Sequence, residues 1–130
     1  MNGKRMIVIG DTGSPEDGNV VGPVLMDPDT GKVIPIPEPD GNTVHYNDPR
    51  SVDVVMSPDA ENGESDIIVG NFGQGTIVRV NPTTGKRTII SQSHGKQIIG
   101  EGPPFVSITD ISISRDKKDI MVLDLSLIHI

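Results

Sequence analysis

Three residues with oxygen-bearing side chains end short apolar segments of similar sequence. Asp11 ends MIVIGD, Asn71 ends DIIVGN and Asp124 ends DIMVLD. Carboxylate and amide oxygens repeated in this way could bind a cation or a polar ligand. The same residue types form Asx turns, in which the side-chain oxygen accepts a backbone N–H two residues on. A turn recurs in every repeat whereas a ligand needs one site, so the pattern favours the turn and leaves ligand binding as the second interpretation.

Two further segments, DPDTG and NPTTG, combine an Asx residue, proline and glycine. Asp27 and Asp29 with Glu38 at the twelfth position suggest a calcium loop, but Lys32 stands where such a loop needs glycine. Proline presets φ at the first corner of a turn, and glycine accepts a positive φ where the next strand begins. The residues expected to form two equivalent hairpin turns are Asp27, Pro28, Gly31, Asn81, Pro82 and Gly85.

The remaining chemically active side chains form no catalytic pattern. His45 and His94 stand alone in polar segments, without nearby partners for metal binding or general-base catalysis. The chain contains no cysteine, which excludes disulfides and thiol catalysis. Arg79 lies between two valines, and could pair with an aspartate of the neighbouring strand or face a ligand. We therefore expect neither a catalytic set nor a metal site in this sequence.

Charge and composition limit the partners. The 130 residues carry a net charge of −7, which disfavours nucleic-acid binding because phosphate contacts need clustered Lys and Arg. No apolar run approaches the length of about 20 residues that crosses a membrane. Only four apolar residues follow Lys4 and Arg5, too few for a signal peptide. The compartment stays open, and would be secreted or periplasmic if a signal peptide lies upstream.

The sequence repeats with a period of 53 to 60 residues. Gly31 and Gly85 are 54 residues apart, and Asp53 and Asp110 are 57 apart. Asp11, Asn71 and Asp124 mark three copies of another position, and the differences in spacing fall in loops. Fifteen glycines and eleven prolines punctuate these copies, which favours short strands and disfavours long helices. The sequence predicts an all-β fold built from repeated units.

One complete unit spans residues 49–92. Its predicted strands are Ser51–Met56, Asp66–Gly70, Thr76–Val80 and Lys86–Ser91. Each is short and rich in β-branched residues, and turn residues separate it from the next. Four antiparallel strands joined by hairpins in about 44 residues describe one blade of a β-propeller.

The segments DIIVGNFGQGTIVRVNPTTGKRTIIS and GEGPPFVSITDISISRDKKDIMVLD resemble bacterial proteins with NHL-like propeller repeats. The matching positions are Asn71, Ile77, Arg79, Val80, Asn81, Pro82, Thr84, Gly85, 88–91, Gly100, Gly102 and Pro103. The resemblance is strongest over 51–124. Asp53 and Asp110 depart from it, because that family commonly has glycine there.

The resemblance implies an incomplete propeller of four-stranded antiparallel meanders. Residues 1–48 would form a partial first blade and linker, 49–92 the complete central blade, and 93–124 a linker and the first half of the next blade. The tail 125–130, LSLIHI, resembles translated sequencing-adapter sequence, so we expect it to be non-native and His129 to have no role. We expect the chain to be a fragment of a larger propeller.

The function expected from this architecture is a scaffold that binds a protein or a small polar ligand. The alternative is a fragment of a propeller enzyme resembling gluconolactonases, strictosidine-synthase-like proteins or streptogramin lyases. In the metal-dependent lactonases a divalent cation is held by residues from several blades, so the full-length protein could bind one. A third interpretation is cell-surface adhesion by a repeat module. Upstream signal and anchor sequences would support the third interpretation.

Overall fold

The computed structural model describes residues 6–12, 21–42, 44, 46, 49–56, 65–71, 75–93, 97–102, 105 and 108–124. This part of the chain forms ten β-strands, all paired antiparallel, and contains no helix. It therefore holds no helix that could cross a membrane. The prediction of an all-β fold is confirmed.

The strands form three sheets in chain order. The first sheet has the order β1-β2-β3, with bounds Ile7–Thr12, Val21–Met26 and Val33–Pro35. The central sheet has the order β4-β5-β6-β7-β8, with bounds Pro49–Met56, Ser65–Asn71, Thr76–Val80, Arg87–Ser93 and Gln97–Ile99. The third sheet pairs β9, Ile108–Ile113, with β10, Ile120–Asp124.

The central sheet differs from the prediction at its far edge. The strand expected over 86–91 runs instead from Arg87 to Ser93, and the three-residue strand β8 pairs with its end. The register joins Gln92 to Ile99 and Ser93 to Gln97. The segment after Gln92, which the sequence assigned to a linker, contributes a fifth strand to the sheet.

Every second residue of the central sheet points to the same face, because side chains alternate along a strand. We call one face the front face; it carries Ser51, Asp53, Val55, Asp66, Ile68, Gly70, Ile77 and Arg79. The opposite face is the back face; it carries Val52, Val54, Ile67, Val69, Asn71, Val78 and Val80. Both faces are buried along β5, where every residue after Ser65 is inaccessible to solvent or nearly so. A strand buried on both faces must lie in the middle of a layered structure.

The third sheet covers the front face. Val55, Ile68 and Ile77 pack against side chains of the third sheet. Those partners are Ile108, Ile111, Ile113, Ile120 and Val122. Complete burial of a side chain such as Ile68 contributes about 2 kcal/mol to folding. The described residues form two hydrophobic cores, and this seam is one of them.

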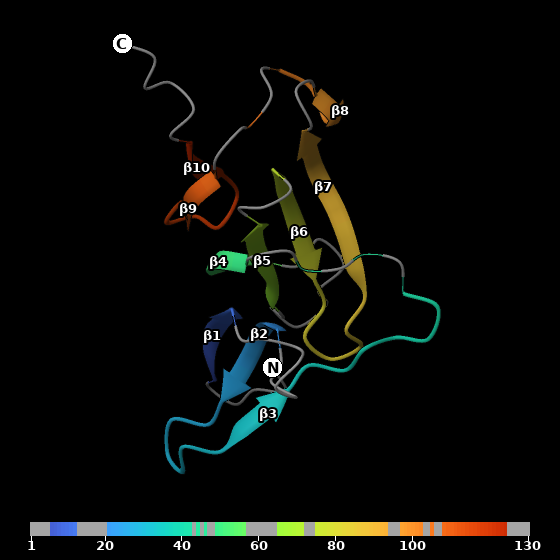
Figure 1. Ribbon diagram of the computed structural model, residues 1–130. Coiled ribbons are helices and arrows are strands. Elements are labelled where there is room, and N and C mark those ends of the chain that lie inside the picture. Colours follow the sequence, from blue (N-terminus) through green and yellow to red (C-terminus); the bar gives the residue numbers. More distant parts are fainter. Residues whose placement is uncertain are drawn as a thin grey trace.

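The first sheet covers the back face. Ile67, Val69, Val78 and Val80 pack against Leu25, and Met6 and Val8 pack against the same cluster. Figure 1 shows the result: β1–β3 lie on one side of the central sheet, and β9 and β10 lie on its other side. The three sheets thus stack in the order in which the chain forms them.

Two glycines make equivalent contacts between neighbouring sheets. A Cβ on Gly70 of β5 would lie 3.2 Å from Cγ2 of Ile108 and 3.3 Å from Cγ2 of Ile111, both on β9. A Cβ on Gly10 of β1 would lie 3.3 Å from Cγ1 of Val52 on β4. Gly10 and Gly70 occupy the same place in the sequence repeat. In both seams this place meets the first strand of the next sheet.

Candidate functional site

The three strand-end residues Asp11, Asn71 and Asp124 lie in three different sheets. Asp11 is opposite Gly22 in the first sheet, Asn71 is opposite Thr76 in the central sheet, and Asp124 belongs to the third. The side chain of Asp11 lies outside the described part of the structure. Within the described residues no group of three or more His, Cys, Asp or Glu side chains could hold a metal ion. No described interaction joins the three strand-end residues into one site.

Asn71 is completely buried, and its side chain bonds within its own sheet. Its Nδ2 donates a hydrogen bond to Oγ1 of Thr76, 3.0 Å away at the start of β6. Thr76 is also buried. A buried amide that bonds across the β5–β6 connection stabilises that connection, since burial without a partner would be costly. Asn71 therefore links the end of β5 to the start of β6 and does not face solvent.

The two segments predicted as hairpin turns have matching hydrogen bonds. The amide of Gly31 donates to the carbonyl of Asp27, and the amide of Gly85 donates to the carbonyl of Asn81, both at 2.8 Å. Oδ1 of Asp27 accepts the amide of Asp29, and Oδ1 of Asn81 accepts the amide of Thr83, both at 2.9 Å. The second residues, Pro28 and Pro82, differ in exposure: the first is exposed and the second is buried.

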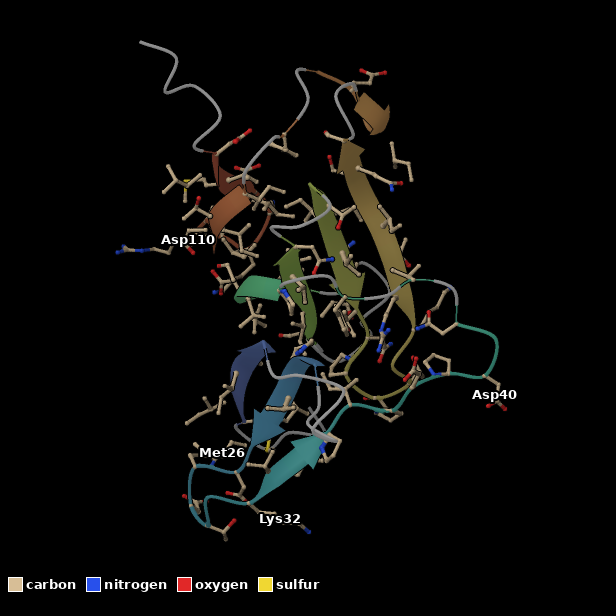
Figure 2. All side chains as sticks on the ribbon, viewed as in Figure 1. Met26, Lys32, Asp40 and Asp110 are labelled. Carbon is tan, nitrogen blue, oxygen red and sulfur yellow. The ribbon has the colours of Figure 1, made fainter. Side chains whose placement is uncertain are left out.

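Gly85 differs from Gly31 in its surroundings. Both have positive φ, 77° and 73° respectively. A Cβ on Gly31 would meet no atom within 4 Å, whereas a Cβ on Gly85 would overlap the carbonyl oxygen of Pro37. The segment that follows β3, described at residues 36–42, 44 and 46, therefore crosses directly over the turn that follows β6. We call it the crossing segment. Figure 2 shows Asp40 on this crossing segment, at the side of the molecule.

A polar cluster joins β4 and β9 at the seam between the central and third sheets. The hydroxyl of Ser51 donates to Oδ1 of Asp110 at 2.6 Å and accepts the amide of Ile111 at 3.0 Å. Asp53 accepts the amide of Val54 through Oδ1 at 2.7 Å and the amide of Ile113 through Oδ2 at 2.8 Å. The two oxygens of this half-buried carboxylate thus bond to different strands, Oδ1 to β4 and Oδ2 to β9.

The sequence repeat is visible in this cluster. Oδ1 of Asp110 accepts the amide of the residue that follows it, Ile111, at 2.9 Å, as Oδ1 of Asp53 does with Val54. Asp53 is half-buried, whereas Asp110 is exposed although its Oδ1 bonds to Ser51 of β4. Figure 2 shows Asp110 beside β9 at the margin of the molecule. The sequence marked these two aspartates as equivalent, but did not predict their partners.

The bonds of this cluster run between strands of two sheets, and the acceptor of the Ser51 hydroxyl is the Asp110 carboxylate. Nucleophilic catalysis by Ser51 would need a neighbouring group that removes the proton of its hydroxyl. Here the hydroxyl donates to a carboxylate and accepts a backbone amide, which fixes its orientation. His45, His94 and His129 lie outside the described residues. The hydrogen bonds of Ser51 and Asp53 hold the central sheet against the third sheet.

The structure also places the side chain of Arg79. Its Nε lies 3.4 Å from Oδ2 of Asp66 on the adjacent strand β5, without the geometry of a hydrogen bond. Arg79 is opposite Ile68, so Asp66 is its diagonal neighbour on the front face. Of the two alternatives left open by the sequence, the ion pair with a neighbouring aspartate is the one found.

A second cluster, around Tyr46, anchors the crossing segment to the central sheet. The guanidinium of Arg87 lies 4.1 Å from the centre of the Tyr46 ring, and its Nη1 donates to the carbonyl of Val44 at 2.7 Å. Glu38 approaches the same nitrogen at 3.9 Å. Burial raises the pKa of the Tyr46 hydroxyl above its ordinary value of 10.0, although the positive charge of Arg87 opposes this shift. Sequence spacing gave no signal for this cluster, because its members come from separate segments.

Comparison with known proteins gives no relative for this chain: no family model matches it, and neither a curated protein nor a solved structure matches it.

Proposed function

We propose that the chain is a segment of an NHL-like β-propeller that serves as a scaffold for binding a protein or a small polar ligand. The observation that carries the proposal is the stacking of three successive sheets, the central one buried on both faces. Blades of a propeller stack in chain order around an axis. The equivalent contacts of Gly10 and Gly70 support a regular repeat of this stacking.

In this proposal, residues 1–48 form a partial blade, 49–92 the complete blade and 93–124 a linker with half of the next blade. The fifth strand, β8, belongs to the linker and extends the edge of the complete blade. The Asp53 and Ser51 bonds across the seam support a structural use of the polar residues that the strands carry.

The surface available for binding is then formed by the turns. Thr83 and Thr84 are exposed at the tip of the β6–β7 turn, and Asp29 and Thr30 are exposed at the equivalent β2–β3 turn. Backbone hydrogen bonds fix both turns, and the hydroxyls of Thr30 and Thr84 accept the amides of Lys32 and Lys86, so the turns are ordered before a ligand arrives. A scaffold of this kind binds through variable turns on a constant framework.

The test is a nuclear magnetic resonance titration of the chain with a panel of sugars, polyols, amino acids and short acidic or basic peptides. The proposal expects chemical-shift changes confined to turn residues, and expects no turnover of a δ-lactone. Lactone hydrolysis that requires Ca²⁺ or Zn²⁺ and stops with a chelator would overturn the scaffold in favour of the lactonase-like enzyme. Shift changes centred on the buried strands β5 and β6 would also contradict it.

A further inference from the structure

Each outer sheet carries exposed apolar side chains among the described residues, although Val24, which lies opposite Ile9 in the first sheet, is buried. On the first sheet, Ile7 is 41% exposed, Ile9 36% and Val33 54%. On the third sheet, Met121 is 56% exposed and Leu123 54%. A shallow hollow of about 220 Å³ lies at the latter two, lined also by Asp110 and Ser112. Exposed apolar patches on β-sheets commonly mark interaction surfaces.

The sequence repeat shows whether each exposed apolar surface corresponds to the front face or to the back face of the central sheet. Ile7 and Ile9 occupy the repeat positions of Ile67 and Val69, so they form the back face of the first sheet. Met121 and Leu123 occupy the positions of Ile68 and Gly70, so they form the front face of the third sheet. In the central sheet the four equivalent residues are all buried by a neighbouring sheet.

Both seams inside the chain join a front face to a back face. The front face of the first sheet, with Met6 and Val8, packs on the back face of the central sheet. The front face of the central sheet packs on the back face of the third, with Ile111 and Val122. Within the described residues, Met121 and Leu123 on one front face and Ile7 and Ile9 on one back face are therefore exposed, and these are the two kinds of face that pack together in the seams of the chain.

We infer that the front face of the third sheet binds the back face of the first sheet of a second copy of this chain, so that copies stack head to tail. The occupant is a second copy because it presents the kind of face that covers the equivalent residues inside the chain. The contact is heterologous, since two different surfaces meet, and it extends into a ring or an open stack according to the rotation between copies. The inference goes beyond the proposed binding function and does not depend on any ligand.

Asp110 is compatible with a covered front face. Its repeat equivalent, Asp53, lies in the seam with both oxygens bonded to backbone amides. An aspartate at this position is therefore stable between two sheets when a strand amide reaches it.

The test uses two blocked variants of the full chain and sedimentation velocity over a range of concentrations. The front-blocked variant carries Met121→Lys and Leu123→Lys, and the back-blocked variant carries Ile7→Lys and Ile9→Lys. The wild-type protein is expected to sediment as species heavier than one chain of 13.9 kDa as its concentration rises. Each blocked variant alone is expected to remain at one chain. An equal mixture of both is expected to form a species of two chains and nothing larger, because one matched pair of faces remains.

Two controls separate this result from other effects of the substitutions. Thr88→Lys adds a lysine at an exposed position of β7 and should leave association unchanged. The chain has a net charge of −7, so added lysines lower the repulsion between copies and cannot explain a loss of association. Met121→Ser with Leu123→Thr serves as an uncharged front-blocked variant if the lysine variant fails to fold.

Three results would overturn the inference. They are a wild-type chain that stays monomeric at every concentration, a front-blocked variant that still associates, and a mixture of blocked variants that forms no two-chain species.

Discussion

The equivalent turns at Gly31 and Gly85 provide a matched pair for measuring how firmly the crossing segment packs on the central sheet. Both glycines have positive φ and donate the same 2.8 Å hydrogen bond. An alanine in the left-handed region costs about 1 kcal/mol of strain at either place. At Gly85 the added methyl group also overlaps the carbonyl oxygen of Pro37 and lies 3.3 Å from Cδ of Pro39.

Overlap with backbone adds a second cost at Gly85, because neither the turn nor the crossing segment can yield through a side-chain rotation. Overpacking of this kind costs about 1–3 kcal/mol. We therefore expect Gly85→Ala to lower the free energy of unfolding by about 2–4 kcal/mol in total, from about 1 kcal/mol of strain and the remainder from overlap. Gly31→Ala should lose only the strain, about 1 kcal/mol.

The assay is urea unfolding of the wild-type chain and the two variants, followed by far-ultraviolet circular dichroism and by the fluorescence of Tyr46. The chain has one tyrosine and no tryptophan, so the fluorescence reports on the crossing segment alone. Equal losses of stability in the two variants would refute the packing of Pro37 against the turn. A Gly31→Ala variant that is the less stable of the two would refute it as well.

Three further predictions test other parts of the structure. Burial raises the pKa of Tyr46, so its midpoint of ionisation, followed by ultraviolet absorbance, should lie above pH 10.0 in the folded chain and at the ordinary value in urea. The stability that Tyr46 contributes should be complete below pH 10 and be lost as the pH rises through the folded pKa. A midpoint at or below pH 10.0 in the folded chain would contradict this prediction. Lys117 has φ 65°, so Lys117→Gly should raise the free energy of unfolding by about 0.5–1 kcal/mol in urea titrations, and a lower stability would show that the conformation is not strained. Asp53→Ala should cost about 1–3 kcal/mol, because the amides of Val54 and Ile113 both lose an acceptor, whereas Asp53→Asn should cost less; thermal melts giving equal losses would argue against the bonds across the seam.

The strands were largely predictable because their signals are local. The β-branched runs around Ile67 and Val78 and the proline and glycine of each turn are contained in short windows of sequence, and the repeat offsets checked one copy against another. Strand β8 was missed because three residues, with two paired positions, carry almost no pattern of their own. Its pairing depends on the place where β7 ends.

The contacts between sheets were not predictable in the same way. Ser51 and Asp110 are 59 residues apart, and Ile113 is 60 residues from the carboxylate that accepts its amide. The sequence identified Asp53 and Asp110 as equivalent positions, but the partners depend on how the sheets stack. The stacking of Arg87 on Tyr46 also depends on the path of the segment after β3.

The strand-end residues show the limit of pattern reasoning about function. The equivalent positions Asp11, Asn71 and Asp124 gave two interpretations, an Asx turn and ligand binding. The structure gives Asn71 a side-chain hydrogen bond. Its burial and its bond to Thr76 are a consequence of packing on both faces of β5, which no property of the DIIVGN segment specifies by itself.

The most direct test of the stacked arrangement is disulfide formation between engineered cysteines, since the chain has none of its own. A Cβ on Gly70 would lie 3.3 Å from Cγ2 of Ile111, close enough for a disulfide between the central and third sheets. The variant Gly70→Cys with Ile111→Cys should oxidise to an intramolecular disulfide that mass spectrometry detects. Ile67→Cys with Ile111→Cys, in which the first cysteine lies on the back face, should not. A folded first variant that forms no disulfide, or equal oxidation of both, would contradict the stacking of the third sheet on the front face of the central sheet.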